Sequence, residues 1–518
     1  MKQTKIRASV AAITGMALFG INGLAQADSV DALLQALRDK GVLSQAEYDT
    51  FNNARDNERV EKVKESALNK GKIKLGDYIN SITPTGDVRV RYELRDAKGQ
   101  AVNGTNGQNA FEKLGRARYA WHLGFKSDSD NDFFTEFRFA SGTNSRSPNN
   151  DFNNTVTTDA GSAPMSKQGG AQVDRVMIGW NTTEWLTLKA GRMQNPLYTT
   201  SMVWDGDLNP EGLAEELHTK FNDVDLFATL GQFSLRTKYD RQTYTDPITG
   251  AVVKENNVAT SKLFAFQGGA HYKFNDETSV KIAPVYYSYA GSGGNGAFSP
   301  GLGNLVGATS AQLKCSSGKY GASLPVGTCN NTGTNNLAIL EVPAEFNWNM
   351  GGHPWKIWAD YAHNFDGDDR AKAAGAITVA NGGSPTLDKS SQDNAVLVGI
   401  QVGSPMALAA WEKVGTYLGS TSGMKKHDWI ARAWYQRVEA YSLDPNLVDS
   451  DVMNAQVNMQ GLAASASYML SDNAFVTLSG AHGTRINDAL GTGGSVDTSI
   501  INADRRYNLL QMDATWRF

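Results

Sequence analysis

Cysteine is almost missing from this sequence, which has two among its 518 residues, Cys315 and Cys329. No histidine and no further cysteine stands near them at the spacing of metal ligands, so a pair of metal-binding thiols is the weaker interpretation. Both cysteines lie in a stretch rich in glycine, serine and asparagine. Behind an export signal, a close pair of this kind predicts a disulfide bond within one loop.

Long apolar runs are also missing, apart from one at the N-terminus. The run Ala8–Leu24 follows Lys2, Lys5 and Arg7, and small residues ending at Ala27 close it. This pattern is typical of a secretory signal peptide, and we expect cleavage after Ala27. Glycines interrupt the run and acidic sequence follows it, which argues against a retained membrane anchor. Since no later run approaches about 20 apolar residues, the sequence excludes a protein built from transmembrane helices.

A surplus of basic residues is missing too. The chain has 49 lysines and arginines against 53 aspartates and glutamates, which gives a formal net charge of −4. Removing the signal peptide with its three cations changes this charge to −7. The charge therefore gives no support for nucleic acid as a partner.

Catalytic motifs are the last absence. The sequence contains no G-x-S-x-G, P-loop or H-E-x-x-H pattern, and its seven histidines are scattered. We therefore expect no enzyme, no cofactor and no metal site. A serine and a histidine that meet on neighbouring strands remain open as a hydrolase, because sequence spacing does not test such a pair.

Alternation of apolar and polar residues is what the sequence has instead. At the C-terminus, Leu510, Met512, Ala514, Trp516 and Phe518 alternate with polar residues, so a strand here has one apolar face. A half-buried strand of a soluble sandwich alternates in the same way, but the pattern recurs along the chain behind an export signal. In lipid, the polar faces of such strands must meet a wet interior. The sequence predicts an all-β fold, a closed transmembrane antiparallel β-barrel that ends at Phe518.

The number of strands follows from the turns. Three strands occur between Asp87 and Phe139, with Val88, Trp121 and Phe137 on their apolar faces. Thirteen more centre on Ile178, Leu188, Glu216, Phe227, Gly268, Ile282, Val342, Trp358, Val398, Trp434, Ser465, Val476 and Met512. Sixteen strands return the chain to the side on which it entered. Ser404–Lys426 is too long for a short turn, and it holds either a small helix or a hidden strand pair that makes eighteen strands.

The segment before the barrel has a different pattern. From Asp28 to about Lys72 apolar residues recur at helical spacing, and Ser44 to Glu47 forms a capping box. We therefore divide the chain into a signal peptide (1–27), a helical periplasmic segment (28–80) and an outer-membrane barrel (81–518). The helical segment is either a small hairpin or coiled coil, or a flexible linker.

Several motifs carry a family resemblance. They are Gly191-Arg192 with Asn195-Pro196, the run from Trp204 to Leu213, and Asp428-Trp429 leading through Trp434-Tyr435 to Asp449-Ser450-Asp451. On these residues the chain resembles the putative porin family of Gram-negative outer membranes and, more distantly, the phosphate-type and general trimeric porins. The resemblance implies an outer-membrane channel and a homotrimer. The Ser404–Lys426 insertion and the loop with the cysteines depart from the family pattern.

Charged residues on the predicted inner face and in one long loop are the candidate pore residues. They are Arg89, Arg91, Arg116, Arg118, Arg138, Arg175, Lys189 and Arg192 on the wall side, and Asp205, Asp207 and Glu211 on the loop side. If the loop from Gly191 to Leu213 folds inward, the two sets create a transverse field across a narrow passage. Alternatively, they are ordinary wall charges that pair across strands.

The predicted function is passive diffusion of small hydrophilic solutes or ions through a water-filled lumen, with weak anion preference. Sixteen strands enclose more space than side chains alone fill. Outer-membrane lipid and small solutes are the expected partners. The competing interpretation is a barrel with a closed lumen that serves as an outer-membrane anchor or adhesin.

Overall fold

A computed structural model describes residues 73–75, 79–101, 109–142, 147–152, 170–236, 242–245, 252–255, 261–291, 337–368, 371, 392–404, 423–444, 447–487 and 501–518. They form a compact unit that begins at Ile73. Cleavage after Ala27, nearly all of the predicted helical segment and the predicted bond between Cys315 and Cys329 lie outside the described residues. None of the helical stretches within the described residues is long and apolar enough to cross a bilayer.

Antiparallel strands form the wall. They are β2 (Ile79–Ala101), β3 (Asn109–Ser129), β4 (Phe133–Ser141), β6 (Ala171–Thr183), β7 (Leu186–Arg192), β8 (Glu211–Phe221), β9 (Val224–Arg236), β12 (Ser261–Asn275), β13 (Thr278–Ile282), β14 (Val285–Gly291), β15 (Ala338–Met350), β16 (His353–Asn364), β17 (Asn394–Gly403), β18 (Trp429–Val438), β19 (Met459–Ser471), β20 (Ala474–Arg485) and β21 (Ile501–Arg517). Short additions are β1 (Ile73–Leu75) on β2 and β5 (Asn150–Asp151) on β3. A separate hairpin, β10 (Gln242–Thr245) and β11 (Val252–Glu255), lies beyond the ends of β9 and β12.

The wall has sixteen strands. The sheet counts 19, but β1 and β5 are short additions, and β13 and β14 both pair with β12 and β15 as one strand interrupted at Ala283 and Pro284. The strand number predicted from the sequence is confirmed. β17 pairs directly with β18, so the alternative of eighteen strands is wrong. Most of the predicted helix in Ser404–Lys426 lies outside the described residues.

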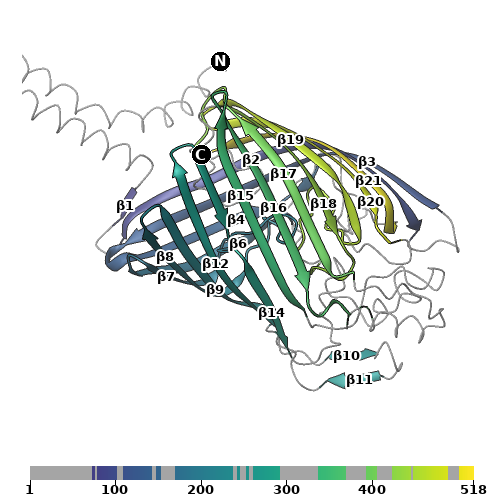
Figure 1. Ribbon diagram of the computed structural model, residues 1–518, viewed down its shortest axis with the longest axis horizontal. Helices are drawn as coiled ribbons and strands as arrows, with labels where there is room; N and C mark the ends of the chain where they lie inside the picture. The colour runs from purple at the N-terminus through teal and green to yellow at the C-terminus, as the bar shows by residue number, and fades with distance from the viewer. Residues whose placement is uncertain are drawn as a thin grey trace, which may run out of the picture. The chain divides into compact units, whose positions relative to one another are not determined.

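The barrel closes where its last strand meets its first. β21 pairs with β2 in a register that places Tyr92 opposite Met512, and Figure 1 shows the yellow end of the chain beside the purple start of the sheet. Backbone hydrogen bonds of 3.0 and 3.1 Å join Phe518 to Gly86. In lipid an unpaired strand edge would leave backbone donors and acceptors without partners, so closure satisfies them all.

Side chains alternate across the wall as the sequence predicts. On β2, Val90 and Tyr92 are 48% and 51% exposed on the outer face, whereas Arg91 and Glu93 are 2% and 0% exposed. The same apolar outer face continues on β21, where Met512 and Trp516 are exposed. The outer surface is therefore apolar and the charged residues point inward.

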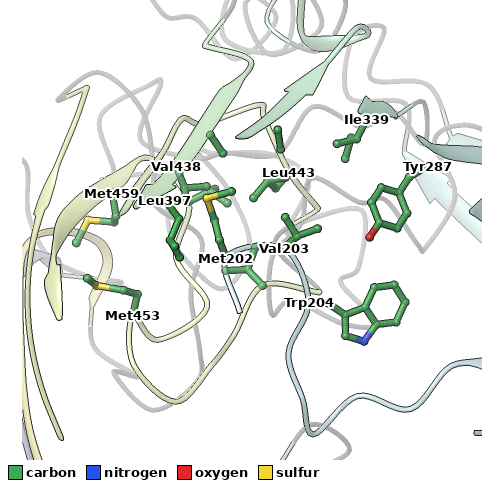
Figure 2. Packing of buried hydrophobic residues seen from close by; sticks show 14 of the residues in the cluster. Met202, Val203, Trp204, Tyr287, Ile339, Leu397, Val438, Leu443, Met453 and Met459 are labelled. Atoms are coloured by element: carbon green, nitrogen blue, oxygen red, sulfur yellow. The ribbon is translucent and has the colours of Figure 1, made fainter. Parts of the chain in front are cut away.

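An apolar core occupies part of the interior, which a wholly water-filled barrel would lack. Figure 2 shows Met202, Val203 and Trp204 packed near Leu443 and Met453, with Tyr287, Ile339 and Leu397 of the wall around them. The first five of these residues belong to two segments that connect strands. The barrel interior thus contains connecting segments packed on wall residues of many strands, among them Phe233, Trp434 and Leu509.

The orientation of the wall is testable by thiol labelling. In a background without Cys315 and Cys329, we expect a membrane-impermeant thiol reagent to label Arg89→Cys in intact membranes and to leave Val90→Cys unlabelled. The reason is that Arg89 lines an inner cavity while Val90 meets lipid. Mass shift after quenching measures the labelling. Denatured samples, in which both variants react, are the control, and the opposite pattern would reverse the assignment.

Candidate functional site in the barrel lumen

The segment Met193–Pro210, here called inner loop 1, lies inside the barrel. Its backbone is held by wall side chains: Gln267 accepts from Tyr198 N at 2.8 Å and donates to Tyr198 O at 2.8 Å. Thr199 Oγ1 donates to Glu341 at 2.6 Å, and Thr200 Oγ1 donates to Asp360. All three wall residues are buried on the inner face of β12, β15 and β16. Four hydrogen bonds therefore fasten the loop across the lumen.

Glycines stand at both ends of inner loop 1, where the chain leaves β7 and joins β8. Gly191 has φ of 123° and Gly212 has φ of 152°, a region that side-chain-bearing residues rarely adopt. A Cβ atom on Gly191 would lie 2.3 Å from Val176 O, and one on Gly212 would lie 2.0 Å from Gln232 O. Only glycine permits the chain to turn inward this close to the neighbouring strands.

A second inward segment, of which 439–444 and 447–458 are described, is here called inner loop 2 and packs against the first. Asp205 N donates to Leu447 O at 2.6 Å, and Asp449 N donates to Ser201 O at 3.2 Å. Ser450 donates from its backbone and its hydroxyl to Asp205 Oδ2, at 3.0 and 2.8 Å. The apolar residues of inner loop 2, Leu443, Val448, Val452, Met453 and Val457, were the signal that it packs inward.

The two inner loops bring four carboxylates together, two from each loop: Asp205, Asp207, Asp449 and Asp451. Asp451 forms an ion pair of 2.9 Å with Arg91 of the wall. Burial opposes ionisation of Asp451, but the guanidinium groups of Arg91 and Arg89 outweigh it and lower its pKa. Burial and neighbouring carboxylates raise the pKa of Asp207, and they raise that of Asp449 as well.

Basic residues predicted for the pore lie on the opposite wall, and carboxylates accompany most of them. Arg91 contacts Asp513 at 2.7 Å, and Arg175 contacts Glu136 at 2.9 Å. Arg138 forms an ion pair with Asp174. Arg89 donates to the amide oxygen of Asn149 at 2.8 Å. These four arginines are held in fixed positions, which is a condition for a static field across the lumen.

The remaining predicted residues lie away from the main cavity. Arg116 and Arg118 share the carboxylates of Glu93 and Asp151 between β2, β3 and β5. Lys189 contacts Glu216 at 2.6 Å across β7 and β8. Arg192 and Glu211 contact each other at 2.7 Å where these strands end. These five residues pair with neighbouring strands, as the alternative interpretation of wall charges describes.

A cavity of about 550 Å³ lies between the inner loops and the wall. Its charged lining consists of Arg89, Arg91, Lys126, Arg138, Arg175, Arg432 and Arg517 with Asp87, Glu136, Asp205, Asp207, Asp449, Asp451 and Asp513. Six of the predicted pore residues are thus brought together, along with several that the sequence analysis did not select. Arg432 was identifiable from its place on the polar face of β18. Among the described residues, no group of three His, Cys, Asp or Glu is arranged to hold a metal ion.

Comparison with known proteins adds a family and several similar folds. Residues 54–298 match the model of a family described as "Putative porin". The sequence matches none of the curated proteins. Among solved structures, the outer membrane channel DcaP of Acinetobacter baumannii is 11% identical, with a TM-score of 0.37, over 85% of this chain and 97% of that chain.

Two further solved structures are similar over most of their length. The outer membrane protein opdK of Pseudomonas aeruginosa is 9% identical with a TM-score of 0.35, over 84% of this chain and 98% of that chain. A mutant porin of Rhodopseudomonas blastica is 9% identical with a TM-score of 0.34, over 84% and 100%. With TM-scores this low, the assignment rests on the family match and on the barrel. The partial match to this family and the closed sixteen-strand barrel together indicate a β-barrel protein of the Gram-negative outer membrane.

The inward turn at Gly212 is testable by substitution. We expect Gly212→Ala to lower the free energy of unfolding by roughly 1 to 3 kcal/mol, because its φ and its contact with Gln232 O both oppose a Cβ atom. Denaturant unfolding in detergent, followed by tryptophan fluorescence, measures the change. Gly268→Ala is the matched control, since a Cβ there meets nothing within 4 Å. Equal stability of the two variants would contradict this account of the loop.

Proposed function

We propose that this chain, whose residues 54–298 match the putative porin family, lets small hydrophilic solutes diffuse passively through the outer membrane. The observation that carries the proposal is the cavity of about 550 Å³ inside a closed barrel, lined by charged groups that fixed partners orient. Side chains that hold such a field select solutes by charge without binding them tightly. The cavity and the apolar core lie at different heights in the barrel: on β21 the cavity is lined by Gln511, Asp513 and Thr515, whereas the core contains Tyr507 and Leu509.

The proposed passage follows strands β2, β3, β4, β6 and β18 to β21, which supply the wall side of the cavity lining. The inner loops supply the opposite side through Asp205, Asp207, Asp449 and Asp451. Seven basic and seven acidic residues line the cavity, so the formal charges cancel when all are ionised. Because the pKa values of Asp207 and Asp449 are raised, the net charge is positive when these two take up protons. This supports weak anion preference.

A barrel with a closed lumen that serves as an anchor or adhesin is the competing function. The packing of two loops within the barrel favours it, because the apolar core blocks part of the interior. Planar-bilayer recording separates the two functions. We expect stable conductance steps from purified protein. The absence of any conductance would favour the anchor or adhesin function.

The sign of selectivity and its pH dependence form a separate prediction. A carboxyl with a raised pKa is neutral below that pKa and becomes charged as the pH rises through it. Lowering the pH from about 9 to about 5 should therefore shift the reversal potential in a salt gradient toward anions. Asp207→Asn should show weaker pH dependence than the unaltered chain, because one titrating group is gone. Asp225→Asn, a wall carboxylate outside the cavity lining, is the control. If the reversal potential changes neither with pH nor with Asp207→Asn, the groups that set the selectivity lie elsewhere.

The oligomeric state is proposed from the family resemblance. We expect a homotrimer that survives detergent without heating, as related porins do, and that dissociates on boiling. Electrophoresis of unheated and boiled samples measures this, and a single monomer band in both would contradict it.

A further inference from the structure

Two hydrogen-bond donors on β18 face the cavity without an acceptor. Arg432 and Trp434 are two residues apart, so both point to the inner face, and they are 7% and 4% exposed. Both line the cavity. Within the described part of the chain, neither Arg432 Nε nor Trp434 Nε1 has a hydrogen-bond partner. Because both donors line the cavity, a solute that enters it can supply the missing acceptor.

Arg432 differs from the arginines across the lumen. Arg91, Arg138 and Arg175 each contact a carboxylate, whereas no ion pair joins Arg432 to any described residue. Its partners across the strands are Gln401 and Ser465, which carry no charge. A buried guanidinium without a counterion is costly, so the site favours an anionic occupant.

The geometry of the donors selects a carboxylate. A guanidinium presents parallel N–H groups that match the two oxygens of a carboxylate. Trp434, two residues along the same face of β18, adds a second donor without a partner to the same lining. Arg432 and Trp434 therefore offer two donors to an anionic group in the cavity.

The inner loops present acidic side chains to the same cavity. Asp207 and Asp449 form no ion pair with any described residue, whereas Asp451 is paired with Arg91 and Asp205 accepts from Ser450. The carboxylate of Asp449 accepts a hydrogen bond from Val452 N at 3.2 Å. A solute with negative charge alone would meet Arg432 favourably, but it would oppose ionisation of Asp207 and Asp449, whereas an ammonium group beside them favours their ionised form. A solute that also carries an ammonium group satisfies both.

We propose that the cavity binds zwitterionic solutes whose carboxylate and ammonium groups are several atoms apart. The carboxylate contacts Arg432 and Trp434, and the ammonium contacts Asp207 and Asp449. This inference rests on the proposed diffusion function, for which it names the preferred solute class. The cavity volume of about 550 Å³ lies within the range of roughly 300 to 1,000 Å³ that ligand pockets occupy.

The test compares three solutes of equal length: γ-aminobutyrate, butyrate and butylamine. Ion current through the protein in planar bilayers gives the concentration of each solute that halves the current. Calorimetry on the whole chain in detergent gives binding without any need for conduction. We expect γ-aminobutyrate to act at a lower concentration than either singly charged solute in both measurements.

Variants separate the two ends of the site. Arg432→Gln should raise the half-blocking concentration of γ-aminobutyrate about tenfold, the effect of losing one charged hydrogen bond. Trp434→Phe, which keeps the ring and removes the N–H, should raise it about threefold. Asp207→Asn should reduce the preference for γ-aminobutyrate over butyrate. Arg437→Gln is the matched control, because Arg437 is on the same strand and pairs with Glu439.

The outcomes are distinguishable. Equal binding of the three solutes, or identical behaviour of Arg432→Gln and Arg437→Gln, would overturn the zwitterion site even if the barrel conducts. A barrel that does not conduct but binds γ-aminobutyrate through Arg432 in calorimetry would support the site and contradict the diffusion function.

Discussion

Closure of the sheet is the constraint on which the rest of this structure depends. A membrane offers no water to the backbone, so each strand must find two neighbours and the last must pair with the first. The pairing of β21 with β2 meets this demand and ends with Phe518 bonded to Gly86. Once the sheet is closed, alternation fixes the direction of every side chain. Outward residues that meet lipid are mostly apolar, and the charged residues must find their partners inside.

The inner loops fill space that closure of the sheet leaves inside the barrel. A ring of sixteen strands encloses more space than inward side chains fill, and many of those side chains are buried and polar. Inner loop 1 brings Thr199 and Thr200 to the buried carboxylates of Glu341 and Asp360, and Tyr287 donates to Glu341 at 2.6 Å. Inner loop 2 then buries the apolar side of inner loop 1. Inner loop 1 thus provides hydrogen-bond partners for buried carboxylates of the wall, and inner loop 2 covers apolar residues of inner loop 1.

The sequence was informative about the fold and less so about the lumen. Alternation has a period of two and needs no knowledge of distant residues, so strands such as β2 and β21 could be recognised from their own residues. Which charges meet depends on register between remote segments, and this is why the contact of Arg91 with Asp513 could not be foreseen. Arg116 and Arg118 had the same appearance in sequence as Arg89, yet they pair near β5 rather than lining the cavity. The packing of inner loop 2 had a signal in its apolar residues, which a search for strands passes over.

Part of the lumen is filled by the apolar core, and part is the charged cavity. Inward residues of β12 to β17, such as Leu263, Tyr287 and Leu397, contact the apolar core and do not line the cavity. The walls of the cavity come from β2, β3, β4, β6 and β18 to β21, and β18 to β21 also supply core residues such as Leu509. Changes on the first group alter the stability of the barrel while leaving the groups that meet a solute in place. Changes on the cavity lining alter the groups that meet a solute, and they also break buried ion pairs such as that of Arg91 with Asp513. A new solute preference therefore costs stability unless both partners of such a pair change together.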